Sequence, residues 1–228
     1  MLDFGFYNMD CMDGMKEFPD GFFDLAIVDP PYGTGGHDFA AKTRFGERFS
    51  RYNRKEDKKI KHGCGHWKYA DVEWDVAPDE TYFEELFRIS RNQIIWGGNY
   101  FMLPACRCFL IWYKTTIPEN FSMSMAEYAW TSFNTNAKVF TFKSSSIKGR
   151  FHPTQKPVEL YAWILNNYAN TGDKILDTHV GSASSLVACR ELGFKYVGFE
   201  IDKDYYDMAK KRLDAAEAQG NIFDFIGG

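Results

Sequence analysis

The sequence has no apolar run of the length that a membrane-spanning helix needs. Its start, Met1-Leu2-Asp3, is acidic and therefore unlike a signal peptide. It has only five cysteines, an odd number, which favours reduced thiols over a disulfide framework. It also has no internal repeat and no low-complexity tract. We therefore expect a cytoplasmic protein with no membrane partner, folded as one domain over residues 1–228.

The composition is that of a globular protein, with 45% hydrophobic and 25% charged residues. The aromatic content of 18% is high, which suits a protein that stacks on flat ligands, although cores also use aromatic residues. The net charge of −4 hides an uneven distribution. Residues 42–68 contain ten basic and three acidic residues, a balance of +7. The rest of the chain contains 17 basic and 28 acidic residues, a balance of −11. This asymmetry indicates a phosphate-binding segment on an acidic body.

The basic residues lie in a polar segment, 34–73, that shows no helical or strand periodicity. It is too long for a plain connection, so we expect a mobile insertion that contacts nucleic acid. The candidate contact residues are Lys42, Arg44, Arg48, Arg51, Arg54 and Lys55. The same segment holds His62, Cys64 and His66, but they lack the paired spacing of a structural zinc site. We therefore predict no metal site.

The most informative stretch is Leu25–Val28 followed by Asp29-Pro30-Pro31-Tyr32. The apolar residues predict a short buried strand, and it must stop at Asp29 because proline cannot donate to a sheet ladder. The prolines stiffen the turn, so that Asp29, the Pro30 carbonyl and the Tyr32 ring form a rigid platform.

This platform suits a nucleobase that carries an exocyclic amine. The Asp29 carboxylate and the Pro30 carbonyl offer two acceptors for the two amine hydrogens, and Tyr32 offers a stacking face. Holding both N–H bonds stabilises the positive charge that develops as the nitrogen attacks a methyl group. The alternative is an ordinary strand and turn with a core tyrosine, so a second group of residues must decide.

The rest of the chain alternates strands with helices. We expect strands over residues 4–9, 25–28, 93–96, 108–113, 127–131, 138–143, 174–177 and 196–201. We expect helices over residues 13–18, 79–90, from Pro157 onward, up to Leu192, and over 204–219. This alternation predicts an α/β fold with a mainly parallel, doubly wound sheet.

The second group of residues comprises Asp177, Gly181 and Glu200. A strand ends at Asp177, a glycine turn leads into a helix, and the next strand ends at Glu200, 23 residues after Asp177. This is the layout of a nucleoside-binding unit, in which the second acid takes the ribose hydroxyls. A single glycine and the absence of a Gly-Lys-Ser/Thr ending favour a nucleoside cofactor without pyrophosphate, and S-adenosylmethionine fits best. An ordinary turn with a surface glutamate is the alternative.

Four sets of residues together resemble the amino-group DNA methyltransferases of the adenine-N6 type and β arrangement. They are Asn8-Met9-Asp10-Cys11, Asp29-Pro30-Pro31-Tyr32, His152-Pro153-Thr154-Gln155-Lys156-Pro157, and Ile175–Ser182 with Gly198-Phe199-Glu200. The resemblance extends from Asp10 to the last helix. It implies the fold of S-adenosylmethionine-dependent methyltransferases with inserted recognition loops, and a short target-recognition segment at residues 115–150.

The resemblance also implies roles for individual residues. Asp29 and the Pro30 carbonyl would hold the adenine amine, Pro31 would stiffen the turn, and Tyr32 would stack on the flipped base. The cofactor would be bound by Asp10, Cys11, Thr154, Lys156, Asp177, His179, Gly181, Ser182 and Glu200. Asp10 and Cys11 would contact its adenine, Lys156 its methionine carboxylate and Glu200 its ribose.

Two residues depart from the family pattern. His179 stands where the family usually has phenylalanine, and Ala183 stands where it usually has a second glycine. Neither change removes a polar ligand, although alanine resists positive φ.

The sequence thus predicts transfer of a methyl group from S-adenosylmethionine to adenine N6 in DNA, with base flipping. Cytosine-N4 methylation is the nearest alternative, disfavoured because that branch typically has serine in place of Asp29. An RNA adenine methyltransferase and a catalytically silent nucleic-acid-binding protein are the others. Cytosine-C5 chemistry is least favoured because the chain has no Pro-Cys dipeptide. We expect no nuclease in this chain and leave a homodimer open.

Overall fold

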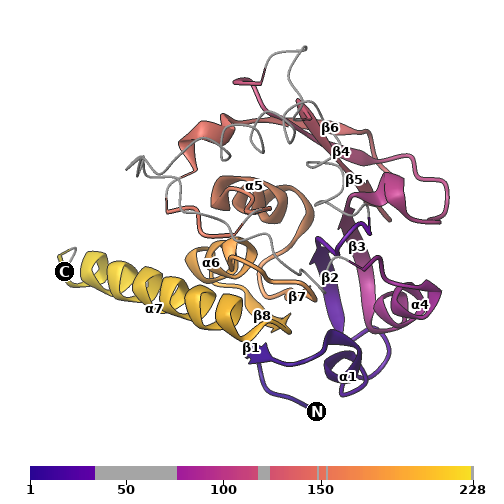
Figure 1. The fold of residues 1–228 in the computed structure, drawn as a ribbon. Helices are drawn as coiled ribbons and strands as arrows, with labels where there is room; N and C mark the ends of the chain where they lie inside the picture. Colours follow the sequence, from indigo (N-terminus) through magenta and orange to yellow (C-terminus); the bar gives the residue numbers. More distant parts are fainter. Residues whose placement is uncertain (34–75, 118–123, 148, 153, 227–228) are drawn as a thin grey trace, which may run out of the picture.

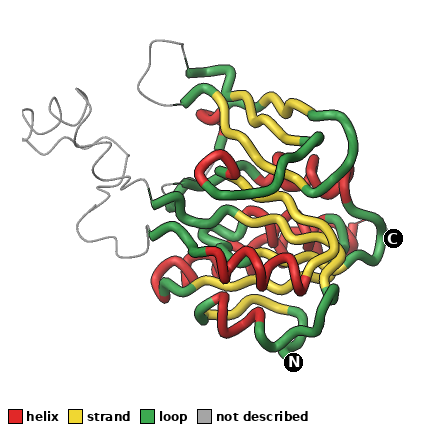
Figure 2. The backbone as a smooth tube through the Cα atoms, turned by 90° about the vertical axis from the view of Figure 1, so that its right-hand side faces the viewer, coloured by secondary structure: helices red, strands yellow, loops and turns green. Residues whose placement is uncertain are grey.

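The computed structural model describes residues 1–33, 76–117, 124–147, 149–152 and 154–226. Its centre is an eight-stranded sheet with the strand order β1-β8-β7-β2-β3-β5-β4-β6. The strands are β1 (Gly5–Asn8), β2 (Phe23–Val28), β3 (Ser90–Trp96), β4 (Phe109–Tyr113), β5 (Ala126–Thr131), β6 (Lys138–Thr141), β7 (Lys174–Asp177) and β8 (Lys195–Glu200). In Figure 1 the sheet runs from β1, near the N-terminus, to β6 at the far edge, and Figure 2 shows the strands in yellow from the side.

The sheet is mainly parallel, as the alternation of strands and helices predicts. Among the eight described strands, only β5 runs against its neighbours, β3 and β4, and the remaining neighbouring strands pair in parallel. The central strand β2 is buried along almost all of its length, which explains why it reads as a continuous apolar run.

Helices cover both faces of the sheet. They are α1 (Cys11–Met15), α4 (Glu80–Ile89), α5 (Val158–Tyr168), α6 (Ser184–Glu191) and α7 (Lys203–Ile226), with short 3₁₀ turns η1 (Gly98–Tyr100) and η2 (Ser144–Ser146). Figure 1 shows α5 and α6 on one side of the sheet and α1 and α4 on the other. The core accordingly has two main parts: α5 packs with β2, β3 and β4 in one, and α1 and α4 pack with β2 and β8 in the other.

Two helices differ from the expected boundaries. Helix α1 begins at Cys11, two residues early, because the Asp10 side chain accepts a hydrogen bond from the Met12 N–H at 2.7 Å and caps it. Helix α7 continues to Ile226 and passes Gly220, which follows the expected end. One glycine costs a helix only about 1 kcal/mol, so it does not have to end there.

The parallel strands place the predicted site residues at one edge of the sheet. Strands β1, β8, β7, β2 and β3 are parallel, so their carboxyl ends lie along the same edge. Strand β2 ends at Val28, directly before Asp29, as the two prolines predict. Only β7 separates β2 from β8, which ends at Glu200. Asp29 and Glu200 therefore face the same edge.

Two expectations from composition can be examined in the described part of the chain. There, no helix is both long enough and apolar enough to cross a membrane. The cysteines in these ranges, Cys11, Cys106, Cys108 and Cys189, are free thiols.

Several predictions concern residues outside the described ranges. The insertion 34–73, with its six basic contact residues and with His62, Cys64 and His66, lies entirely outside them. The same holds for residues 118–123 and 148 of the expected recognition segment 115–150. The other residues of that segment form β5, β6, η2 and their connections.

Candidate active site

The Asp29 carboxylate lies at the carboxyl end of β2 and is held from two sides. The Tyr32 hydroxyl donates to Asp29 Oδ1 at 2.7 Å, and the Lys156 ammonium forms an ion pair with Asp29 Oδ2. The side chain keeps 14% of its surface exposed. Because an ionised carboxylate has about four acceptor positions, the two bonds leave capacity for a further donor.

The Pro30 carbonyl is the second acceptor of the platform. None of the described residues donates a hydrogen bond to it. Asp29 and Pro30 therefore both retain acceptor capacity, which a pair of amine hydrogens requires.

The Tyr32 ring lies within an aromatic cluster at the end of β3. It stacks on Tyr100, with ring centroids 4.8 Å apart and planes 17° apart, and Phe101 meets it edge-on at 6.2 Å. Gly97 lies so close that a Cβ at this position would overlap the ring, and its φ of +68° also favours glycine. Burial raises the pKa of Tyr32 well above its ordinary value, with Asp29 contributing, so the hydroxyl remains protonated. Tyr100, which is 53% exposed, occupies the stacking face here.

Lys156 connects Asp29 to a carboxylate that no sequence motif singled out. Its side chain is 2% exposed, and its ammonium also forms an ion pair with Glu127 in β5 at 3.1 Å. Glu127 forms a second ion pair with Lys114, which follows β4. Lys156 also lies over the Trp96 ring, 5.3 Å from its centroid. Burial alone would lower the pKa of Lys156, but the carboxylates of Asp29 and Glu127 raise it above its ordinary value.

The second predicted group lies around the turn between β7 and α6. Asp177 ends β7, Gly181 is in the turn, and Glu200 ends β8. Asp177 is buried, and its carboxylate accepts hydrogen bonds from the His179 N–H at 3.0 Å and from the Ser185 hydroxyl. Burial raises the pKa of Asp177 to about 7. Glu200 Oε2 accepts from the Gly181 N–H at 2.8 Å, which fixes the acid of β8 to the glycine turn.

Ala183 follows in the same turn with φ of +60° and is the one non-glycine residue with positive φ in the described ranges. Ala183 thus adopts a backbone conformation that favours glycine, at a position where the family usually has glycine.

His179 and Cys11 bring the two ends of the chain together. The Cys11 sulfur lies 4.0 Å from His179 Nε2, and His179 Nδ1 shares a hydrogen bond of 2.9 Å with the Thr178 hydroxyl. The Tyr82 ring meets the imidazole edge-on at 5.4 Å. Burial lowers the pKa of His179 to about 4, so the ring is neutral at physiological pH. Burial also raises the pKa of Cys11 to about 12, so its thiol is protonated.

The remaining predicted residues have local partners. Asp10 caps α1, Thr154 shares a hydrogen bond of 3.1 Å with His152 Nδ1, and Ser182 shares one of 3.1 Å with Ser184. The neighbouring Gln155 has a buried Nε2 with no hydrogen-bond partner among the described residues. Sequence reasoning did not assign Gln155 a role, although it is part of the quoted motif.

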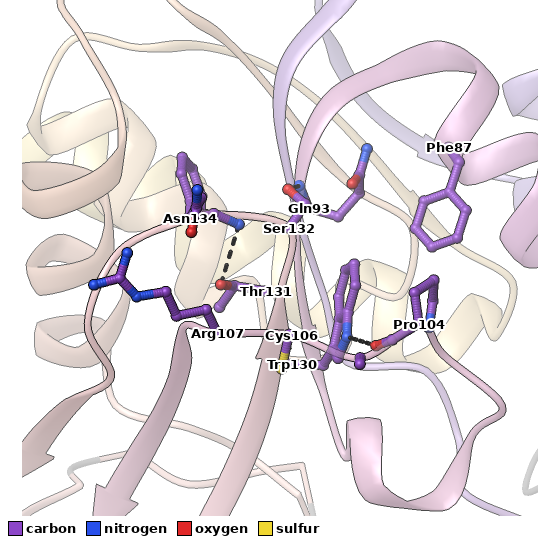
Figure 3. Close-up of a pocket in the computed structure, with 11 residues that line it drawn as sticks. Phe87, Gln93, Pro104, Cys106, Arg107, Trp130, Thr131, Ser132 and Asn134 are labelled. Atoms are coloured by element: carbon purple, nitrogen blue, oxygen red, sulfur yellow. Dashed lines mark hydrogen bonds between the residues drawn. The ribbon is translucent and has the colours of Figure 1, made fainter.

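A hollow lies at the opposite edge of the sheet (Figure 3). It is lined by residues before β4 and at the end of β5, among them Cys106, Arg107 and Trp130. Several polar atoms there already have partners: Trp130 Nε1 donates to the Pro104 carbonyl at 2.6 Å, and Arg107 donates to Asn136 at 3.0 Å. Because β5 is antiparallel to β3, this hollow lies at the amino ends of the parallel strands, away from Asp29.

A mainly parallel sheet flanked by helices, with acids along its carboxyl edge, fits the class of S-adenosylmethionine-dependent methyltransferase folds. Residues 50–211, more than half of the chain, match the family model of the N6/N4 DNA methylases. The chain belongs to this family of S-adenosylmethionine-dependent DNA methyltransferases. Over 75 residues it is 43% identical to the type II methyltransferase M.HpaI of Haemophilus parainfluenzae. That match covers 33% of this chain and 23% of the relative.

Solved structures agree on the fold over nearly the whole chain. The M1.HpyAVI complex with S-adenosylmethionine has a TM-score of 0.53 and 21% identity, covering 91% of this chain and 98% of that one. The cytosine-N4-specific PvuII DNA methyltransferase has a TM-score of 0.57 and 11% identity, covering 95% and 92%. The two similarities establish the fold and leave the target base open.

Proposed function

We propose that this chain transfers a methyl group from S-adenosylmethionine to the N6 amine of adenine in DNA. The observation that carries the proposal is the position of Asp29, which shares the carboxyl edge of the sheet with Glu200 and is separated from it by one strand. Ligands of open α/β sheets bind at this edge, so a base at Asp29 and a nucleoside at Glu200 would meet there.

The residues at the edge fit the proposed cofactor. Glu200 supplies a carboxylate for ribose hydroxyls, and the Gly181 turn that it fixes allows close backbone approach. The buried Gln155 amide has a donor without a partner among the described residues, which suits a carboxylate such as that of methionine. Asp10, Cys11, Thr154, Asp177, His179 and Ser182 are proposed to complete the site, and Lys156 would reach it from Asp29.

The protein's part in the reaction is to hold and orient the amine. When bound, the cofactor supplies an electrophilic methyl group on a sulfonium. Asp29 and the Pro30 carbonyl accept the two amine hydrogens, which directs the nitrogen lone pair out of the base plane. The nitrogen would gain positive charge as the new N–C bond forms and the methyl–sulfur bond breaks, and Asp29 would stabilise this charge until the surplus N–H proton leaves to water. Proximity and orientation supply much of the remaining acceleration.

The target base has to leave the duplex, because its amine is otherwise paired. Stacking on Tyr32 compensates part of that cost, with base–aromatic stacking typically contributing about 1–3 kcal/mol. Tyr100 occupies the Tyr32 face in the free protein, so the base has to displace this half-exposed ring. The basic residues Lys42, Arg44, Arg48, Arg51, Arg54 and Lys55 are proposed to bind the DNA backbone.

The decisive experiment identifies the methylated base. Purified protein is incubated with DNA and isotope-labelled S-adenosylmethionine, and the DNA is digested to nucleosides and analysed by mass spectrometry. We expect labelled N6-methyladenine in DNA, and none when RNA replaces DNA. The Asp29→Ala variant should lose methyl transfer and keep cofactor binding, measured by calorimetry. Loss of cofactor binding together with normal transfer at saturation would contradict the assignment.

Cytosine-N4 methylation is the second candidate. It is favoured by the similarity in fold to the cytosine-N4-specific PvuII enzyme, since the same edge holds an exocyclic amine equally well. It is disfavoured by Asp29, where that branch typically has serine. Labelled N4-methylcytosine in the same digest would establish it instead.

A further inference from the structure

Four side chains at the carboxyl edge form a continuous series of ion pairs with alternating charge. Lys114 pairs with Glu127, Glu127 with Lys156 at 3.1 Å, and Lys156 with Asp29. Only the two at one end, Asp29 and Lys156, belong to the sequence motifs of the family. Lys114 and Glu127 come from the last strands of the sheet and have no assigned role.

The backbone fixes the two unassigned residues firmly. Glu127 is the second residue of β5 and lies opposite Trp112 of β4. The Lys114 N–H donates to the Met125 carbonyl at 2.8 Å, so the turn out of β4 is tied to the start of β5. Because β5 runs antiparallel to β3, its first residues reach the edge where β2 and β3 end. This arrangement brings Glu127 to Lys156.

The series is largely removed from water. The side chains of Lys156, Lys114 and Glu127 are 2%, 10% and 26% exposed. Burial by itself would raise the pKa of Glu127, but the ammonium groups of Lys156 and Lys114 keep it below its ordinary value, so Glu127 is a carboxylate at neutral pH. A buried ion pair is on average a weak source of stability, because desolvation offsets the attraction. A gain in folding stability therefore does not by itself explain these ion pairs.

The charge balance at Asp29 suggests what the series does. A group of net positive charge next to the amine opposes a developing cation, so the balance of carboxylates and ammonium groups around Asp29 affects the reaction. Without Glu127, the ammonium groups of Lys156 and Lys114 would be balanced only by the Asp29 carboxylate, which leaves a net charge of +1 beside the amine. With Glu127 between the two ammonium groups, the four side chains are balanced and carry no net charge.

We propose that Glu127 is a positioning residue for methyl transfer: it holds the Lys156 ammonium and offsets its charge, so that the charge of Asp29 stays effective at the reacting amine. The inference rests on the proposed methyltransferase function and applies equally to an adenine and a cytosine amine. Glu127 acts through Lys156 and does not itself touch the base.

The test uses charge rather than shape. Glu127→Gln keeps the size of the side chain but leaves Lys114 and Lys156 with one carboxylate between them. We expect the single-turnover rate, with cofactor and DNA saturating, to fall about 10- to 100-fold, while the dissociation constant for the cofactor changes less than about threefold. The double variant Lys114→Met/Glu127→Gln removes one excess cation and should recover about tenfold of the lost rate. Lys114→Met alone should be within about threefold of wild type or faster.

A purely structural role predicts a different pattern. If Glu127 mattered only as a hydrogen-bond partner, the double variant would be as slow as Glu127→Gln. That result would overturn the proposal, and so would a Glu127→Gln rate within about threefold of wild type. If Glu127→Gln does not fold, as judged by thermal unfolding, the double variant decides: a rate within about tenfold of wild type supports the proposal, and a larger loss overturns it.

A matched control separates the site from the rest of the molecule. Glu85 on α4 forms an ion pair with Arg88 at 2.6 Å and lies on the other face of the sheet. Glu85→Gln should leave the single-turnover rate unchanged. Failure of wild type to methylate any base would refute the proposed function, whereas an active wild type with an unaffected Glu127→Gln refutes only this inference.

Discussion

Replacing Lys156 by methionine removes one buried cation and retains a side chain of similar length. In the wild-type protein this cation balances Asp29 and Glu127, whose side chains are only 14% and 26% exposed. The substitution leaves Asp29 with the Tyr32 hydroxyl and Glu127 with Lys114. Methionine should continue to pack against Trp96, so the loss is electrostatic rather than a cavity.

Breaking a buried ion pair by removing one partner typically costs about 3–5 kcal/mol. Because both carboxylates retain one partner each, we expect the lower end, about 3 kcal/mol, for Lys156→Met. For a chain of this size, 1 kcal/mol corresponds to about 2–4 °C in Tm, so Tm should fall by about 6–12 °C.

The direction of the Glu127 pKa shift determines how the stability loss of Lys156→Met varies with pH. The pKa of Glu127 is lower in the folded protein than in the unfolded chain, so its ion pairs stabilise above the ordinary carboxyl pKa and are lost as the pH falls through the folded value. The difference between wild type and Lys156→Met should therefore be largest at pH 7–8 and shrink toward about pH 4. Urea denaturation at several pH values measures it. A difference below about 1 kcal/mol at neutral pH, or one independent of pH, would refute this reasoning.

Three further predictions concern single residues. Asp177 has a folded pKa of about 7, above its unfolded value, so it lowers stability as the pH rises from about 4 to about 7. Asp177→Asn should reduce the stability lost over this range by about 1–3 kcal/mol in urea denaturation. An unchanged loss would contradict the burial argument. Gly97→Ala should displace Tyr32 and add about 1 kcal/mol of backbone strain. We expect a lower Tm together with slower methyl transfer. A wild-type rate would show that the position of Tyr32 is dispensable. His179→Phe removes the hydrogen bond to Thr178 and keeps the edge-on contact with Tyr82. Calorimetry should therefore find a cofactor affinity within about threefold of wild type. A loss of more than about tenfold would show that the imidazole itself binds the cofactor.

The parts of the fold that local chemistry dictates could be predicted from the sequence. The end of β2 at Val28 follows from two prolines that cannot donate to the sheet, and the strand Lys174–Asp177 has the expected bounds. The positive φ of Ala183 was also detectable, because alanine stands where the family usually has glycine. Each of these depends on residues close together in the chain.

The Glu127 contacts could not be predicted in the same way. Nothing in the order of the strands along the chain says that β5 inserts between β3 and β4, and only this insertion brings Glu127 to Lys156. The one available signal was a carboxylate at the start of a strand whose later residues, Ala129 to Thr131, are buried. Helix α1 shows a smaller difference of the same kind, since the side chain of Asp10, expected to contact the cofactor, caps the helix.

The antiparallel direction of β5 places part of the proposed recognition segment beside the proposed catalytic carboxylate. A parallel strand at this place would begin at the opposite edge of the sheet, where the hollow beside Trp130 lies, and would carry an early residue such as Glu127 away from Asp29. An antiparallel strand instead brings the start of β5, and the end of the segment that precedes it, to the reacting edge. The proposed recognition segment, 115–150, therefore includes a residue, Glu127, that is linked to the proposed catalytic carboxylate of Asp29 through one ammonium.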